Sequence, residues 1–226
     1  MQFSSILGLP LLFKLLPKDG LSKEELINQA IGYWGVISFI IALIVIIFIV
    51  QRNKETMEMR GSKPPLSTAV GWAIGGPFIA LIAQALAASI ENLIGIEMGS
   101  QNTADLLEIA KVAPIFILVI SILAPAIEEI VFRKVIFGGL YTKFNFIISA
   151  LISSVIFAVV HGEPQHILIY ASMGFTFAFL YVKTKRLLVP IFAHVAMNSY
   201  VVAVQLLFAD DIQKLQEQTF VIFPFL

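Results

Sequence analysis

A stretch of twenty uncharged residues, 31–50, limits the folds that are open to this chain. About 20 apolar residues form a helix long enough to cross the roughly 30 Å of hydrocarbon in a bilayer. The stretch therefore predicts a membrane-spanning helix.

Further apolar stretches follow along the sequence, at residues 66–90, 112–137, 144–161, 166–182 and 187–208. Residues 1–16 are also apolar, but Gly8 and Pro10 interrupt them, so we expect a seventh helix whose beginning is missing or which lies obliquely. The predicted fold is all-α, a polytopic membrane bundle of about seven helices. No long linker divides it, so we expect one domain over residues 1–226. A polar tail at 210–218 predicts a short surface helix.

The composition agrees with a membrane protein. Hydrophobic residues make up 58% of the 226 residues and charged residues only 13%, against about 25% charged in soluble domains. A water-soluble fold of this size could not bury so much apolar surface. The absence of cysteine excludes a disulfide scaffold, a thiolate zinc site and a cysteine nucleophile. Equal numbers of acids and bases argue against nucleic-acid binding. The apolar composition indicates that membrane lipid surrounds the chain.

The basic residues predict an orientation. Ten of the fifteen lysines and arginines lie in residues 51–65, 133–143 and 183–186, and the segments between them are poor in positive charge. Because cytoplasmic loops are rich in lysine and arginine, we expect the amino terminus inside and the carboxyl terminus outside. Segment 91–108 is acidic, as an outer loop can be. The composition favours a bacterial plasma membrane.

Charged residues inside a span usually have a partner or a function. Glu129 and Arg133 are four residues apart with the acid first, the favoured order for a helical ion pair. Glu128 lies about 100° around the helix and faces elsewhere. A carboxylate without a cationic partner in a low dielectric can act as a base. Spacing thus assigns Glu129 to structure and Glu128 to chemistry, unless this helix end simply lies in the wet interface.

The histidines form a second group. His194 and Asn198 share one helical face and offer two donors to a developing oxyanion, although a hydrogen bond between helices would use the same pair. His161 ends another helix, where an interfacial position is equally open, and Phe157 lies one turn earlier on its face. His166, with Glu163, flanks a proline-containing turn and is expected to face the outer interface.

Three motifs stand in order on three hydrophobic segments: EEIVFR (128–133), FAVVH (157–161) and HVAMN (194–198). They match the patterns E-E-x-x-x-R, F-x-x-x-H and H-x-x-x-N. The set resembles the CPBP family, also called Abi, of intramembrane endopeptidases, which includes the type II CAAX prenyl proteases. The resemblance covers about residues 112–205.

The resemblance implies a glutamate-dependent endopeptidase that acts on peptide or membrane-protein substrates. By motif position, Glu128 with His161 would activate water. His194 with Asn198 would hold the oxyanion of the tetrahedral intermediate. We expect these four side chains, which come from three helices, to line one polar cavity.

The same motifs imply that Glu129 and Arg133 brace the helix and that no cofactor is needed. A metal-dependent variant stays open, because Glu128, His161 and His194 would make a His₂Glu set of the catalytic zinc type. A non-enzymatic immunity or regulatory protein of the same family is the main alternative function. A transporter would also use intramembrane Glu and His, but no inverted repeat supports that reading.

Overall fold

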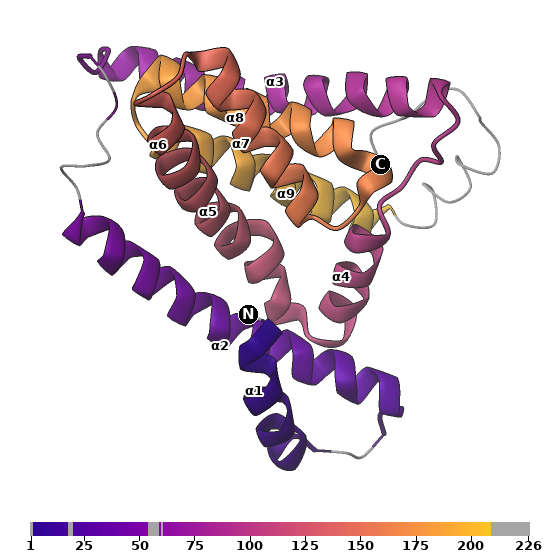
Figure 1. Cartoon of the computed structure of the whole chain (residues 1–226). Coiled ribbons are helices and arrows are strands. Elements are labelled where there is room, and N and C mark those ends of the chain that lie inside the picture. The colour runs from indigo at the N-terminus through magenta and orange to yellow at the C-terminus, as the bar shows by residue number, and fades with distance from the viewer. Residues whose placement is uncertain (1, 18–19, 54–58, 60, 209–226) are drawn as a thin grey trace.

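A computed structural model of the chain describes residues 2–17, 20–53, 59 and 61–208. Helices are the regular structure throughout these residues, which confirms the all-α prediction (Figure 1). The surface helix predicted at 210–218 lies outside the described residues.

The described elements follow in chain order: α1 (Gln2–Leu15), α2 (Lys23–Arg52), α3 (Leu66–Leu93), α4 (Gln101–Val112), η2 (Pro114–Phe116), η3 (Val119–Leu123), α5 (Ala124–Glu128), η4 (Glu129–Phe137), α6 (Gly138–Tyr141), α7 (Phe146–Val160), η5 (Pro164–His166), α8 (Ile167–Thr184) and α9 (Leu188–Leu207).

Five helical segments are long and apolar enough to cross a membrane within the part of the chain that the structure describes: α2, α3, Pro114–Tyr141, Pro164–Thr184 and α9. Ser4–Leu15 and Phe146–Val160 are shorter apolar helices. Together they correspond to the seven predicted apolar segments. The chain is therefore a multi-pass helical membrane protein.

The first predicted span begins earlier than its uncharged stretch. Ser22 caps α2, because its side chain accepts a hydrogen bond from the Glu25 backbone while the Glu25 carboxylate accepts one from the Ser22 backbone. The helix therefore begins at Lys23, more than two turns ahead of residue 31. The indole nitrogen of Trp34 then donates to Ser4 Oγ at 3.2 Å and ties α1 to α2.

The acidic segment 91–108, which we expected to be an outer loop, contains most of the helix α4. Ser100 caps it by accepting a hydrogen bond from the Thr103 backbone. Leu107 and Ala110 on its inner face are buried, and α4 packs against α2. A hydropathy profile does not reveal α4, because its outer face is polar and only a narrow apolar stripe packs against the rest of the protein.

Small residues let the central helices approach one another. Helix α3 runs without interruption through Pro77, and a Cβ added to Gly76 would lie 2.8 Å from Leu180 of α8 and 3.1 Å from Ala193 of α9. A Cβ on Gly174 of α8 would lie 2.9 Å from Ser154 of α7. Gly76 and Gly174 thus allow neighbouring helices to pack closely.

Polar and charged groups lie inside this bundle, and large apolar side chains cover its outside. Helices α3, α7, α8 and α9 pack together around a core that includes Phe157, Phe177 and Met197. Exposed isoleucine, leucine, valine and phenylalanine side chains cover the outward faces of α2, α3 and α7. This arrangement suits a hydrocarbon solvent.

Candidate active site

The helix that bears the first motif is locally widened on both sides of Glu128. Two π-helical segments, Val119–Leu123 and Glu129–Phe137, flank the short α-helix Ala124–Glu128. Pro125 lies within this short helix. π-helical turns are rare and often occur at functional sites, and Glu128 directly precedes the second of these segments. Residue spacing alone did not predict them.

Glu129 and Arg133 form the predicted ion pair, fully buried. Arg133 donates from Nε to Glu129 Oε2 at 2.9 Å and from Nη2 to Oε1 at 3.2 Å, and both side chains are 0% exposed. The guanidinium also lies over the ring of Phe157, at 5.0 Å from the centroid. A bidentate pair with an aromatic neighbour compensates a charge that could not otherwise be buried.

The buried pair also holds a histidine from another helix. His194 Nδ1 of α9 lies 3.0 Å from Glu129 Oε1, and the imidazole stacks on Phe177 with a centroid distance of 4.5 Å. The ring is 2% exposed. Its Nε2 is therefore turned toward Glu128, whose Oε2 lies 3.8 Å away. Residue spacing pairs Glu129 with Arg133 alone and does not reveal this contact.

Glu128 differs from its neighbour in both burial and contacts. Its side chain is 28% exposed. The separation of 3.8 Å from His194 is too long for a hydrogen bond. Glu128 is thus the acid of the pair that remains outside the arginine bridge and faces the cavity.

His161 lies at the end of α7, where its ring is tightly constrained. Nδ1 lies 2.7 Å from the carbonyl oxygen of Phe157, one turn earlier. The Phe157 ring packs beside it, as predicted, at a centroid distance of 4.4 Å. The carbonyl can only accept, so Nδ1 carries the proton and Nε2 is the acceptor of the neutral ring.

Asn198 lies one turn beyond His194 on α9 and reaches the first π-helical segment. Its Nδ2 donates to the carbonyl oxygen of Ile120 at 3.3 Å. A carboxamide nitrogen has two hydrogens, so this bond fixes the side chain without using its full donor capacity.

Glu128, His161, His194 and Asn198 line one cavity of about 820 Å³. The four side chains share one cavity, as expected, but its wall is not uniformly polar. Its wall also includes Tyr170 and apolar side chains such as Phe116, Met173 and Val202. The cavity wall thus combines polar and apolar side chains.

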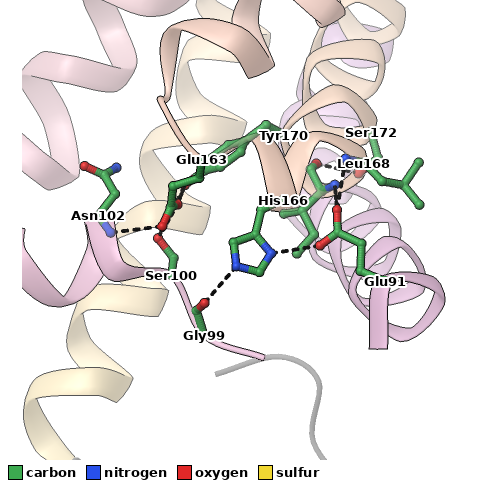
Figure 2. Close-up of polar contacts among 10 residues, drawn as sticks. Glu91, Gly99, Ser100, Asn102, Glu163, His166, Leu168, Tyr170 and Ser172 are labelled. Carbon is green, nitrogen blue, oxygen red and sulfur yellow. Dashed lines mark hydrogen bonds and ion pairs between the residues drawn. The ribbon is translucent and has the colours of Figure 1, made fainter. Parts of the chain in front are cut away.

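His166 and Glu163 do not face the outer interface, and that expectation was wrong. Both are buried, at 5% and 6% exposure. His166 Nδ1 lies 2.9 Å from Glu91 Oε2, and Nε2 lies 2.9 Å from the carbonyl oxygen of Gly99 (Figure 2). Apart from Tyr170, which is seven residues from Glu163, their partners come from α3 and from the start of α4, more than sixty residues away in sequence, so no local pattern could reveal these distant contacts.

The His₂Glu metal set was tested against this geometry. Among the described residues, no three histidine, aspartate or glutamate side chains lie together in a way that could hold a metal ion. His161 and His194 each direct Nδ1 to a protein oxygen, and neither contact uses Nε2. The grouping of these side chains does not match a metal site, and the reaction proposed for this chain uses no metal.

Comparison with known proteins shows which family the chain belongs to. The family model for the type II CAAX prenyl endopeptidase Rce1-like proteins matches residues 110–200. A Bacillus subtilis (strain 168) protein named as the membrane peptidase YdiL is 49% identical over 208 residues, which cover 91% of this chain and 85% of that protein. The chain belongs to the Rce1-like CAAX protease family. The matched region contains all three motifs.

A second relative has a similar extent. The membrane-embedded CAAX protease MroQ of Staphylococcus aureus (strain USA300) is 38% identical over 219 residues, which cover 93% of this chain and 88% of that protein. No solved structure matches the chain. Both relatives are bacterial membrane proteins named as peptidases, so this family member is a protease-like membrane protein.

Proposed function

We propose that this chain is a glutamate-dependent intramembrane endopeptidase. The observation that supports it best is the division of labour between two adjacent acids. Glu129 is fully buried against Arg133, whereas Glu128 is partly exposed to a cavity that His161, His194 and Asn198 also line. A general base must reach a substrate or a water, and Glu128 has that access.

In the proposed reaction, Glu128 and His161 hold a water molecule between them. The Glu128 carboxylate takes a proton from this water as its oxygen bonds to the carbon of the scissile peptide carbonyl. The carbonyl π electrons move onto oxygen, which gives a tetrahedral intermediate. The protonated Glu128 then returns the proton to the leaving nitrogen as the C–N bond breaks, so the products are a carboxyl and an amine.

His161 contributes through its tautomer. Because Nδ1–H donates to the Phe157 carbonyl, Nε2 can accept a hydrogen bond from the water. This hydrogen bond orients a lone pair of the water oxygen toward the substrate carbonyl. His161 is thus proposed to orient the nucleophile, and Glu128 to take the proton.

His194 and Asn198 are proposed to stabilise the oxyanion. His194 gives Nδ1 to Glu129, so it can donate from Nε2 when both ring nitrogens are protonated. Asn198 offers its second Nδ2 hydrogen. Donors fixed in advance cost no reorganisation when charge develops, which is why such sites are effective.

The substrate class follows from where the site lies. The four residues belong to apolar helices, and the cavity is lined by apolar as well as polar side chains. We propose that substrates are peptide segments of proteins or peptide precursors that reach the site within a bacterial plasma membrane. The amino terminus is proposed to lie inside and the carboxyl terminus outside.

The experiment that tests this proposal is comparative peptidomics of the native host. Cells that express wild type and cells that express Glu128→Gln are compared, with Glu108→Gln, an exposed acid of α4, as the matched control. We expect one or more cleavage products to disappear in Glu128→Gln and to persist in the control. Unchanged products in Glu128→Gln at equal expression would refute glutamate catalysis and favour a non-enzymatic regulatory role.

Metal dependence is tested separately on the purified protein. Cleavage should survive prolonged chelation, and metal analysis of the active protein should find no stoichiometric transition metal. Activity that is lost on chelation and restored by one metal would contradict the proposed reaction.

A further inference from the structure

The imidazole of His161 contacts two aromatic rings. The Phe157 ring lies tilted against it, with a centroid distance of 4.4 Å and an interplanar angle of 52°. Tyr170 of α8 stacks against it with a centroid distance of 4.1 Å and an interplanar angle of 26°. The Nδ1 contact with the Phe157 carbonyl fixes the ring edge. Rotation of His161 would break the hydrogen bond and both ring contacts.

Tyr170 is itself anchored by a buried acid. Its hydroxyl donates to Glu163 Oε2 at 2.6 Å. Glu163 also accepts from Ser100 Oγ at 2.7 Å and from the Asn102 backbone nitrogen at 3.1 Å, as Figure 2 shows. Burial alone would raise the pKa of Glu163, but these donors, Tyr170 first, hold it below its usual value. The carboxylate is therefore a fixed, charged acceptor.

A second buried acid fixes the backbone beneath Tyr170. Glu91 Oε1 of α3 accepts hydrogen bonds from the backbone nitrogens of Leu168 and Ile169, at 2.9 and 3.1 Å. These are donors of the first turn of α8, which has no side-chain cap from its own N-cap residue. Glu91 thus caps α8 from another helix, and its other oxygen contacts His166 (Figure 2). The start of α8, and Tyr170 with it, cannot move without breaking this network.

We infer that Tyr170 is a positioning residue for His161, and that Glu163 is the anchor that holds the tyrosine ring in place. The tyrosine hydroxyl is engaged with Glu163, so its role is not acid–base chemistry. Its ring face, in contrast, keeps His161 Nε2 directed at the water site. This inference rests on the proposed function, because it assigns Tyr170 to the step in which His161 acts.

The kinetic test uses the peptide found by the peptidomic comparison, prepared as an internally quenched fluorescent substrate. Tyr170→Leu removes the stacking ring, and misplacement of a reacting group by about 1 Å can cost roughly 10²-fold in rate. We expect kcat to fall by about that factor while KM changes little. Tyr170→Phe and Glu163→Gln keep the ring but weaken its anchor, so their losses should be smaller.

The matched control is Tyr181→Phe. Tyr181 is also a buried tyrosine of α8 but packs against Phe137 in a different cluster. Its variant should keep kcat. A rise in KM with unchanged kcat in Tyr170→Leu would make Tyr170 a substrate contact and would overturn the inference.

A readout that does not depend on activity is histidine ¹⁵N NMR of the full chain in nanodiscs. The chain has three histidines, so His161→Asn assigns the His161 signal directly. In wild type and in Tyr181→Phe we expect a protected Nδ1–H resonance from His161. This resonance should broaden or disappear in Tyr170→Leu. The same protected resonance in Tyr170→Leu would overturn the inference.

The two proposals fail in different ways. If His161→Asn keeps full turnover, the proposed water-activating pair is wrong, whatever Tyr170 does to the NMR signal. If His161→Asn is inactive but Tyr170→Leu keeps both kcat and the Nδ1–H resonance, the positioning role is wrong and the proposed function stands. Should Tyr170→Leu fail to fold, Tyr170→Phe and Glu163→Gln carry both measurements, and wild-type values in both variants would overturn the anchor.

Discussion

Replacement of Glu129 by alanine should destabilise the protein far more than the same change at Glu128. Arg133 is 0% exposed and gives two hydrogen bonds to Glu129, so Glu129→Ala leaves a buried guanidinium without its counter-charge. Loss of one partner of a buried ion pair costs about 3–5 kcal/mol. Glu128 is partly exposed and outside hydrogen-bond distance of His194, so Glu128→Ala should cost no more than about 1 kcal/mol.

The assay is the free energy of unfolding, measured by SDS titration in mixed micelles and followed by tryptophan fluorescence. A double variant separates charge compensation from chemistry. Glu129→Leu with Arg133→Met removes both charges, and apolar replacement of a buried pair is often close to neutral in stability. The double variant should therefore regain most of the stability lost in Glu129→Ala. The double variant should nevertheless be inactive, because His194 Nδ1 loses the Glu129 carboxylate that it contacts.

Two results would refute this reasoning. A greater loss of stability in Glu128→Ala than in Glu129→Ala would show that the arginine bridge is not what supports the helix. Full activity in the double variant would show that the contact between Glu129 and His194 is not needed for the reaction.

Three further predictions concern other parts of the molecule. Asn198→Ala should lower kcat by about 10²–10³-fold with KM nearly unchanged; a large change in KM alone would make Asn198 a substrate-binding residue instead. Gly174→Ala should cost about 1–3 kcal/mol by overpacking, because the added Cβ would lie 2.9 Å from Ser154. Gly71→Ala, whose Cβ would have no heavy atom within 4 Å, should not destabilise the protein. Equal unfolding free energies of the two variants in the same SDS titration would contradict the packing argument. Hydrogen bonds outweigh the effect of burial and hold the pKa of Glu163 below its usual 4.5, so the contribution of the carboxylate to stability is complete above pH 4.5 and is lost as pH falls through the lowered pKa. The difference in unfolding free energy between wild type and Glu163→Gln should therefore narrow below about pH 4.5. A difference that stays constant with pH would argue against a charged Glu163.

The spans and the acid pair could be predicted from the sequence because they depend on local chemistry. Twenty uncharged residues have few alternatives to a membrane helix, and a four-residue spacing brings Glu129 and Arg133 together on any helix. The order of the three motifs was enough to expect one cavity. The structure confirms each of these features.

The features that the sequence did not reveal depend on partners that are distant along the chain. Glu91 and His166 are 75 residues apart, and Glu129 and His194 are 65 residues apart. The contact of Tyr170 with His161 joins residues on either side of the turn between α7 and α8, which neither helix's own periodicity predicts. Helix α4 was missed because its polar face hides a narrow buried stripe. The π-helical segments around Glu128 have no simple residue pattern, since they differ from an α-helix only in backbone hydrogen bonding.

The most direct test of the central proposal is single-substrate kinetics of purified Glu128→Gln in nanodiscs, with thermal stability measured on the same sample. Loss of a general base lowers the rate by about 10²–10⁴-fold. We predict a fall of that size in kcat with the unfolding midpoint unchanged, because the carboxamide preserves the shape of a side chain that is 28% exposed. Cleavage at the wild-type rate by a folded Glu128→Gln would contradict the proposal that Glu128 activates the water.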